Sequence, residues 1–120
     1  MLFCAILLEE RIIPTLFSNA FLLAFINASL EDFGLSPIEA LASRSPVIGF
    51  GQGGLLETTS EGKTAIYFRR QDPKDIIEAV KEFEKTNFVS PAEIRASVEK
   101  FGREQFRAKF KNAVDQCLAN

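Results

Sequence analysis

The sequence predicts an α/β fold in which a short parallel sheet of about three strands lies between helices. Three apolar segments have the length of buried strands, namely Phe21–Ala28, Pro46–Phe50 and Thr64–Phe68. Helical patterns alternate with these segments. Strands that alternate with helices are typical of parallel sheets, because each crossover helix returns the chain to the same end of the sheet. We therefore expect a three-layer unit with helices on both faces.

The composition predicts one domain and excludes several classes of function. The chain has 120 residues, 47% of them hydrophobic, which suffices for a single core, so we expect residues 1–120 to form one unit. A net charge of −2 provides no basic field to attract nucleic acid. No segment reaches the roughly 20 consecutive apolar residues that cross a bilayer, so we expect no transmembrane helix.

Cysteine usage indicates a reducing compartment. Cys4 and Cys117 lie near opposite ends of a chain that has no histidine, so the ligand spacing of a zinc site is absent. Free thiols in the cytoplasm are the simplest interpretation. A disulfide between the two cysteines stays open.

The segment before the first strand is ambiguous. Met1–Leu8 is apolar, but it lacks a basic start and runs into acidic residues, which favours core over a targeting signal. Leu7–Asn19 has helical spacing, although Pro14 would break or restart a helix there.

The central part of the chain alternates helices, turns and strands. A helix is expected from Ser36 to about Ser43, and its inner face would carry Ile38, Leu41 and Ala42. The turn Gly51–Gly54 ends the second strand, a helical turn follows at Leu55–Thr59, and the turn Glu61–Lys63 precedes the third strand.

The remainder of the chain is predicted to be helical. Asp72 and Pro73 are typical of a helix start, and the inner face of that helix would carry Ile76, Ile77, Val80 and Phe83. Ser90 and Glu93 form a capping box that opens a second helix, with Ile94, Val98 and Phe101 on one face and Gly102 at its end. A last helix would carry one stripe, made by Phe106, Phe110, Ala113 and Cys117.

Two glutamates near the first strand are the candidates for chemistry. Glu31 lies in the loop after that strand, and Glu39 lies in the helix that follows. Ligands of open α/β sheets bind outside the carboxyl ends of the strands, close to helix N-termini. An alternative explains Glu39 by structure alone, because Ser36, Pro37 and Glu39 have the spacing of a capping box. Lys63, Arg69 and Arg70 could contact phosphate, but a solvated turn and strand end explain them better.

Taken together, the ordered motifs resemble a known family. The segments NASLEDFGLSPIEALA at Asn27–Ala42 and PVIGFGQGGLLE at Pro46–Glu57 are similar to the donor-binding half of retaining GT-B glycosyltransferases, of the glycosyl transferases group 1 family. The resemblance covers about residues 15–120. It implies a partial Rossmann-like unit, corresponding to the second half of the C-terminal, nucleotide-sugar-binding domain, with the N-terminal acceptor domain absent.

The resemblance also implies roles for individual residues. Glu31 would be catalytic, orienting the donor sugar and stabilising positive charge at its anomeric carbon. Glu39 would bind the ribose hydroxyls of the nucleotide. The remaining donor-binding residues would be Phe33, Gly34, Leu35, Ser36, Gly53 and Gly54. Glu57 belongs to the same signature, and we expect it to cap or brace the glycine loop.

The expected reaction transfers a glycosyl unit from a nucleotide diphosphate sugar to an acceptor hydroxyl, with retention of configuration and without metal or other cofactor. One alternative is an inactive truncated or split remnant, which binds a nucleotide sugar weakly or docks on a partner chain that supplies the missing domain. Another is a purely structural α/β module. We expect a cytoplasmic protein, with the inner face of a membrane as an alternative place of action.

Overall fold

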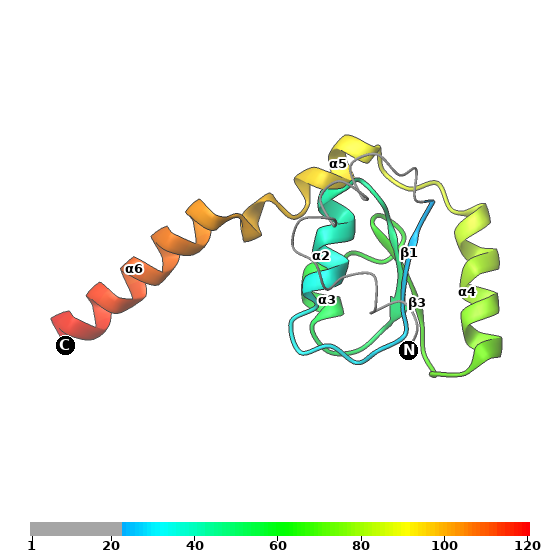
Figure 1. The fold of residues 1–120 in the computed structure, drawn as a ribbon, viewed down its shortest axis with the longest axis horizontal. Coiled ribbons are helices and arrows are strands. Elements are labelled where there is room, and N and C mark those ends of the chain that lie inside the picture. Colours follow the sequence, from blue (N-terminus) through cyan, green and yellow to red (C-terminus); the bar gives the residue numbers. More distant parts are fainter. Residues whose placement is uncertain (1–22) are drawn as a thin grey trace, which may run out of the picture.

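The computed structural model of the protein describes residues 23–120, and it contains one parallel sheet of three strands (Figure 1). The strands are β1 (Phe25–Asn27), β2 (Val47–Phe50) and β3 (Ala65–Phe68), in the spatial order β1-β2-β3. The predictions for Met1–Leu8, Leu7–Asn19 and Cys4 lie outside the described residues, as does the start of the first predicted strand. The predicted α/β class and the parallel sheet are confirmed.

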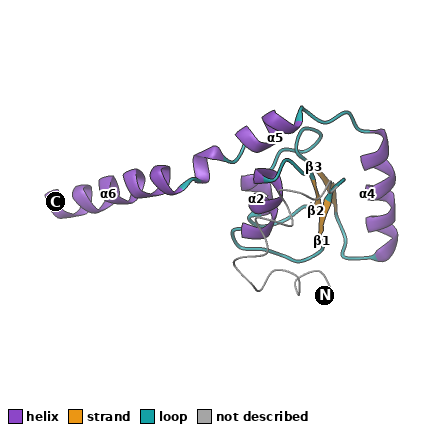
Figure 2. Cartoon of the chain, turned by 45° about the horizontal axis from the view of Figure 1, so that its top comes forward, coloured by secondary structure: helices purple, strands orange, loops and turns teal. Residues whose placement is uncertain are grey.

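Helices cover both faces of the sheet, which makes the predicted three layers (Figure 2). On one face, α2 (Leu35–Ala42), α3 (Leu55–Thr58) and α5 (Pro91–Ala96) share a core with Val47 and Ala65. On the other face, α4 (Pro73–Lys85) packs its Ala79 against Ile48, Phe50, Ile66 and Phe68. Neighbouring strand residues enter opposite cores because side chains alternate between the faces of a strand.

The helix starts in the C-terminal half follow local sequence signals. Asp72 accepts a hydrogen bond from the Lys74 N–H at 2.8 Å and so caps α4. Ser90 and Glu93 form the predicted capping box at the start of α5. These carboxylates and hydroxyls satisfy backbone N–H groups that a helix leaves without internal partners.

Three expectations for these helices are wrong. Ile77 is 53% exposed instead of facing the core, because α4 turns Ile76, Ala79 and Val80 toward the sheet. The second helix stops at Ala96, and Phe101 belongs to a separate short 3₁₀ helix, η2 (Glu99–Phe101). Gly102 ends η2 and not α5.

The last helix, α6 (Arg103–Ala119), extends away from the three layers (Figure 1). It buries no residue, and Phe106 is 64% exposed although its ring lies 5.7 Å from that of Phe110. Cys117 is an exposed free thiol. Among residues 23–120, no helix combines the length and the apolar character needed to cross a membrane.

We predict that Leu41→Ala destabilises the fold strongly, because Leu41 is fully buried between α2 and the sheet. The expected loss is about 2 to 5 kcal/mol in the free energy of unfolding, measured by urea denaturation. Leu118→Ala is the matched control, since Leu118 is 80% exposed and its loss should stay within about 0.5 kcal/mol. Equal effects of the two substitutions would contradict the packing described here.

Candidate functional site

Loops that follow all three strands meet at one edge of the sheet. Because the strands are parallel, residues 28–34, 51–54 and 69–72 all emerge at the carboxyl ends. The Gln71 side-chain N–H donates to the Ala28 carbonyl oxygen at 2.7 Å, which joins the third loop to the first. This is the edge where open α/β sheets bind their ligands.

The first two loops are packed backbone to backbone. The Gly54 N–H donates to the Glu31 carbonyl oxygen at 2.7 Å. A Cβ atom on Gly53 would overlap that same carbonyl oxygen, and one on Gly54 would overlap the carbonyl oxygen of Asp32. The two glycines predicted to bind donor therefore have a packing reason of their own, which is the contact between the loops.

Thr58 of α3 bonds to the second loop, and Thr59, which follows α3, bonds to β3. The Thr58 hydroxyl donates to the Gly54 carbonyl at 3.1 Å, and Thr59 Oγ1 lies 2.7 Å from the hydroxyl of Tyr67. Burial raises the pKa of Tyr67, against the effect of its hydrogen bond with Thr59. The Glu57 side chain is exposed and has no hydrogen bond or ion pair among residues 23–120. Thr58, and not Glu57, braces this loop.

The start of α2 differs from the predicted capping box. Gly34 is the N-cap residue, in the left-handed conformation with φ at +84°, and no side chain caps the helix. The predicted box is wrong because this glycine starts the helix early and places Ser36 inside the first turn. The third helical position is then Pro37, which has no N–H to cap. There is room for a side chain at Gly34, because an added Cβ would meet only ordinary contacts. Glycine is therefore required at this position by the positive φ and not by a lack of space.

Without the capping box, Glu39 is a half-buried carboxylate on α2 that caps no helix. Its side chain has no hydrogen bond or ion pair among residues 23–120. Burial raises the pKa of Glu39 above its ordinary value. Leu35 and Ser36 lie four and three residues before it, on the same side of α2.

The predicted inner position of Ala42 is wrong, because Ala42 is exposed and Ala40 is buried instead.

Glu31 is held differently from Glu39. The Ser29 hydroxyl lies 2.8 Å from Glu31 Oε1, and the backbone carbonyl of Glu31 is bonded to Gly54. Sequence reasoning did not identify Ser29, because no motif marks a contact between side chains two residues apart in a loop.

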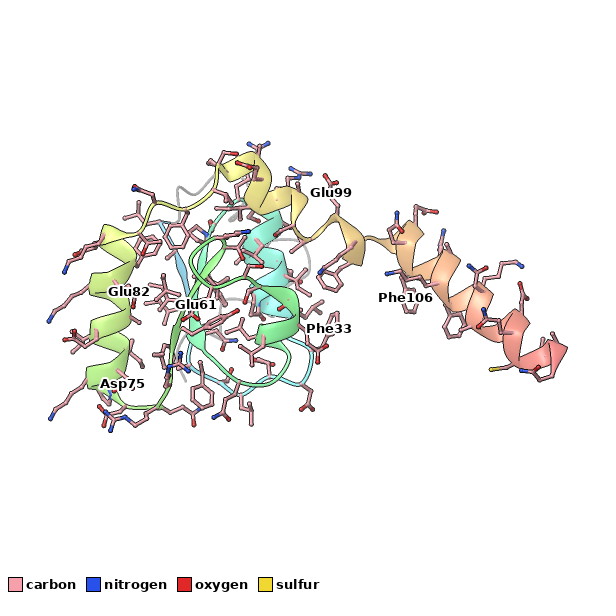
Figure 3. All side chains as sticks on the ribbon, turned by 180° about the vertical axis from the view of Figure 1, so that it is seen from behind. Phe33, Glu61, Asp75, Glu82, Glu99 and Phe106 are labelled. Atoms are coloured by element: carbon pink, nitrogen blue, oxygen red, sulfur yellow. The ribbon has the colours of Figure 1, made fainter. Side chains whose placement is uncertain are left out.

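Phe33 projects from the same loop toward the C-terminal part of the chain (Figure 3). Phe33 is 51% exposed, and its ring meets Phe101 of η2 edge to face, with centroids 5.7 Å apart. Lys100 Nζ lies 5.0 Å from the centre of the Phe101 ring. Nothing in the local sequence signals this contact, which depends on the path of the chain through α5 and η2.

Of the basic residues considered as phosphate contacts, Arg69 and Arg70 follow β3 at the carboxyl end of the sheet, and both are exposed. Arg70 pairs with Asp75 at 2.9 Å, and this hydrogen bond raises the pKa of Arg70 and lowers that of Asp75. Lys63 precedes β3 and so lies at the opposite end of the sheet. In the described part of the chain, no group of three or more acidic or cysteine side chains could hold a metal ion.

A three-stranded parallel sheet with helices on both faces is a partial Rossmann-like unit. The chain matches the family described as "Glycosyl transferases group 1" over residues 8–105 and belongs to that family. It is therefore a glycosyltransferase-family protein, and the resemblance seen in its motifs is confirmed. Comparison with curated proteins and with solved structures found no match.

We predict that Gly53→Ala is more harmful than Gly62→Ala. Both glycines have positive φ, +65° and +75°, so both substitutions carry the strain of the left-handed conformation, on the order of 1 to 2 kcal/mol. Only at Gly53 would the new methyl group overlap another loop, since a Cβ at Gly62 meets nothing within 4 Å. Urea unfolding should show the larger loss for Gly53→Ala. Equal losses would mean that the loops can separate freely.

Glu39 should make stability depend on pH. Its pKa is higher in the folded than in the unfolded state, so the folded state binds more protons between these two values. The Glu39 contribution to stability therefore falls as pH rises from the ordinary glutamate range through the raised pKa. Glu39→Gln removes this dependence. As pH rises across this interval, the unfolding free energy of the wild type should therefore fall relative to that of Glu39→Gln. A difference that stays constant with pH would contradict the prediction.

Proposed function

We propose that this chain binds a nucleotide diphosphate sugar and takes part in transferring its glycosyl unit to an acceptor hydroxyl, with retention of configuration. The observation that carries the proposal is Glu39, a half-buried carboxylate without a side-chain partner among residues 23–120. Burying such a group without a partner reduces stability, and perturbed carboxylates of this kind are typical of functional sites. Its two oxygens suit a pair of neighbouring hydroxyls, as on ribose.

The start of α2 supports a place for the diphosphate. The backbone N–H groups of Leu35 and Ser36 belong to the first turn, where a helix has no internal acceptors and carries partial positive charge. The positive φ of Gly34 turns the chain into the helix, and Phe33 flanks the entry. These residues would bind the donor through their backbone.

Glu31 is the proposed catalytic residue. In the proposed reaction, the bond between the anomeric carbon and the diphosphate oxygen breaks as the acceptor oxygen attacks from the same face. The acceptor proton passes to the departing phosphate oxygen on that face. The carboxylate of Glu31 stabilises the positive charge that develops on the sugar. Gly53 and Gly54 keep the Glu31 loop in place through the packing described above.

We also propose that this unit works beside an acceptor-binding domain, whether in the same polypeptide or in a partner chain. Among residues 23–120, β1 pairs only with β2, so its other edge has no described strand. The apolar residues around β1 are open to solvent, with Leu23 at 82%, Ile26 at 40% and Leu30 at 58% exposure. The same observation favours a second candidate, a unit that binds nucleotide sugar without turnover until its partner is present.

The test is calorimetric binding of a panel of UDP-, GDP- and ADP-linked hexoses to the wild type and to Glu39→Gln. We expect one donor to bind and its affinity to fall about tenfold or more in the variant, because hydrogen bonds to a charged group are lost. Glu82→Gln is the matched control, because Glu82 is exposed on α4, across the sheet from α2 (Figure 3). Unchanged affinity in Glu39→Gln would refute the role of this residue.

Turnover separates the two candidates. Release of nucleoside diphosphate should fall by about 10² to 10³ in Glu31→Gln if Glu31 stabilises the transition state. Binding without release in the wild type would instead favour the unit that needs a partner. Failure of the wild type to bind any donor of the panel would contradict both.

A further inference from the structure

The side chain of Glu31 belongs to a small hydrogen-bonded chain that starts inside the sheet. Asn27 is the last residue of β1 and is only 7% exposed. Its Oδ1 accepts from the Ser29 N–H at 3.1 Å, and Ser29 Oγ lies 2.7 Å from this oxygen and 2.8 Å from Glu31 Oε1. Three alternate residues thus connect the rigid end of β1 to the candidate catalytic carboxylate.

The orientation of the Asn27 amide follows from the backbone. The Ser29 N–H can only donate, so the amide must direct its oxygen, and not its nitrogen, toward Ser29. Asn27 Nδ2 is consequently buried without a hydrogen-bond partner among residues 23–120. A buried donor without a partner costs stability, so the amide keeps this orientation through the bonds that Ser29 makes with Oδ1 at its other end.

The Ser29 hydroxyl has one hydrogen for two acceptors. Asn27 Oδ1 accepts from the Ser29 N–H in either case, whereas the Glu31 carboxylate has no other donor among residues 23–120, and its charge makes the bond stronger. The hydrogen is therefore best directed at Glu31 Oε1. Among the described residues, the other carboxylate oxygen, Oε2, has no partner.

We propose that Ser29 is a positioning residue, which, anchored by Asn27, holds one oxygen of Glu31 and leaves the other for a single hydroxyl of the ligand. Glu31 then differs from Glu39, which offers both oxygens. The backbone of Glu31 is fixed by Gly54 and its carboxylate by Ser29, so the side chain is preorganised before any ligand binds. The effect of Ser29 on sugar binding rests on the proposed function, but the positioning of Glu31 by Ser29 can be measured without any ligand.

The first measurement concerns Glu31 itself, in the free protein. Three-bond scalar couplings measured by NMR report whether the Glu31 side chain occupies one rotamer or several. We expect a single rotamer in the wild type and in Ser29→Thr, which keeps the hydroxyl, and averaged couplings in Ser29→Ala. The Ser29 N–H remains in all three, so the backbone should not change. A single Glu31 rotamer in Ser29→Ala would overturn the inference.

The second measurement is donor affinity with the panel of UDP-, GDP- and ADP-linked hexoses. Ser29→Ala should weaken binding about 3- to 10-fold, the effect of one lost hydrogen bond, and Ser29→Thr should restore it to within about twofold. Ser97→Ala is the control, because it removes a hydroxyl bonded to the Ile94 carbonyl at the end of α5. If the wild type binds none of these sugars, the proposed function fails and the couplings still decide the role of Ser29. If the wild type binds and Ser29→Ala binds equally well, the positioning role fails alone.

Discussion

The hydrogen bond from the Gly54 N–H to the Glu31 carbonyl joins two loops that follow neighbouring strands, at a distance of 2.7 Å. Parallel pairing of β1 with β2 brings these loops to the same edge, and the missing side chains of Gly53 and Gly54 let the two backbones touch. The residues of the candidate site between Glu31 and Glu39 come directly after this contact in the sequence. Once Glu31 is fixed, Gly34 turns the backbone, α2 begins, and the distance between the two candidate carboxylates is set by one loop and one helical turn.

The sequence predicted the architecture well, because hydrophobic periodicity and helix caps are local properties. The signals at Asp72 and at Ser90 with Glu93 were confirmed, since nothing nearby competes with them. The same kind of signal was wrong at Ser36, where a glycine in the left-handed conformation starts the helix earlier. Contacts between distant segments had no signal at all. The bond from Gln71 to Ala28 spans 43 residues, and its partners carry no pattern that could pair them.

The two candidate carboxylates show how one short segment holds the same chemical group in two different ways. Glu39 lies on a helix that is covered on its inner side, and its neighbours among residues 23–120 provide burial but no hydrogen bond to its side chain. Glu31 sits in a loop whose own residues provide the hydrogen bond. The first arrangement stores an unsatisfied acceptor that a ligand can satisfy, at some cost in stability. The second limits the motion of an acceptor, so that less conformational entropy is lost when a ligand arrives.

The exposed helix α6 has a consequence for how the chain opens. Its 17 residues bury nothing, so its stability rests on helix propensity, on the pair of Phe106 and Phe110, and on ion pairs such as Lys111 with Asp115, each contributing only about 0.2 to 0.5 kcal/mol. An isolated helix of this length is marginal in water. The amide hydrogens of α6 should therefore exchange with solvent when this helix alone frays. Those of β2, which is buried on both faces, should exchange only when the three-layer part unfolds. Residues 23–120 thus divide into the three-layer part and α6, and a single melting temperature describes only the three-layer part.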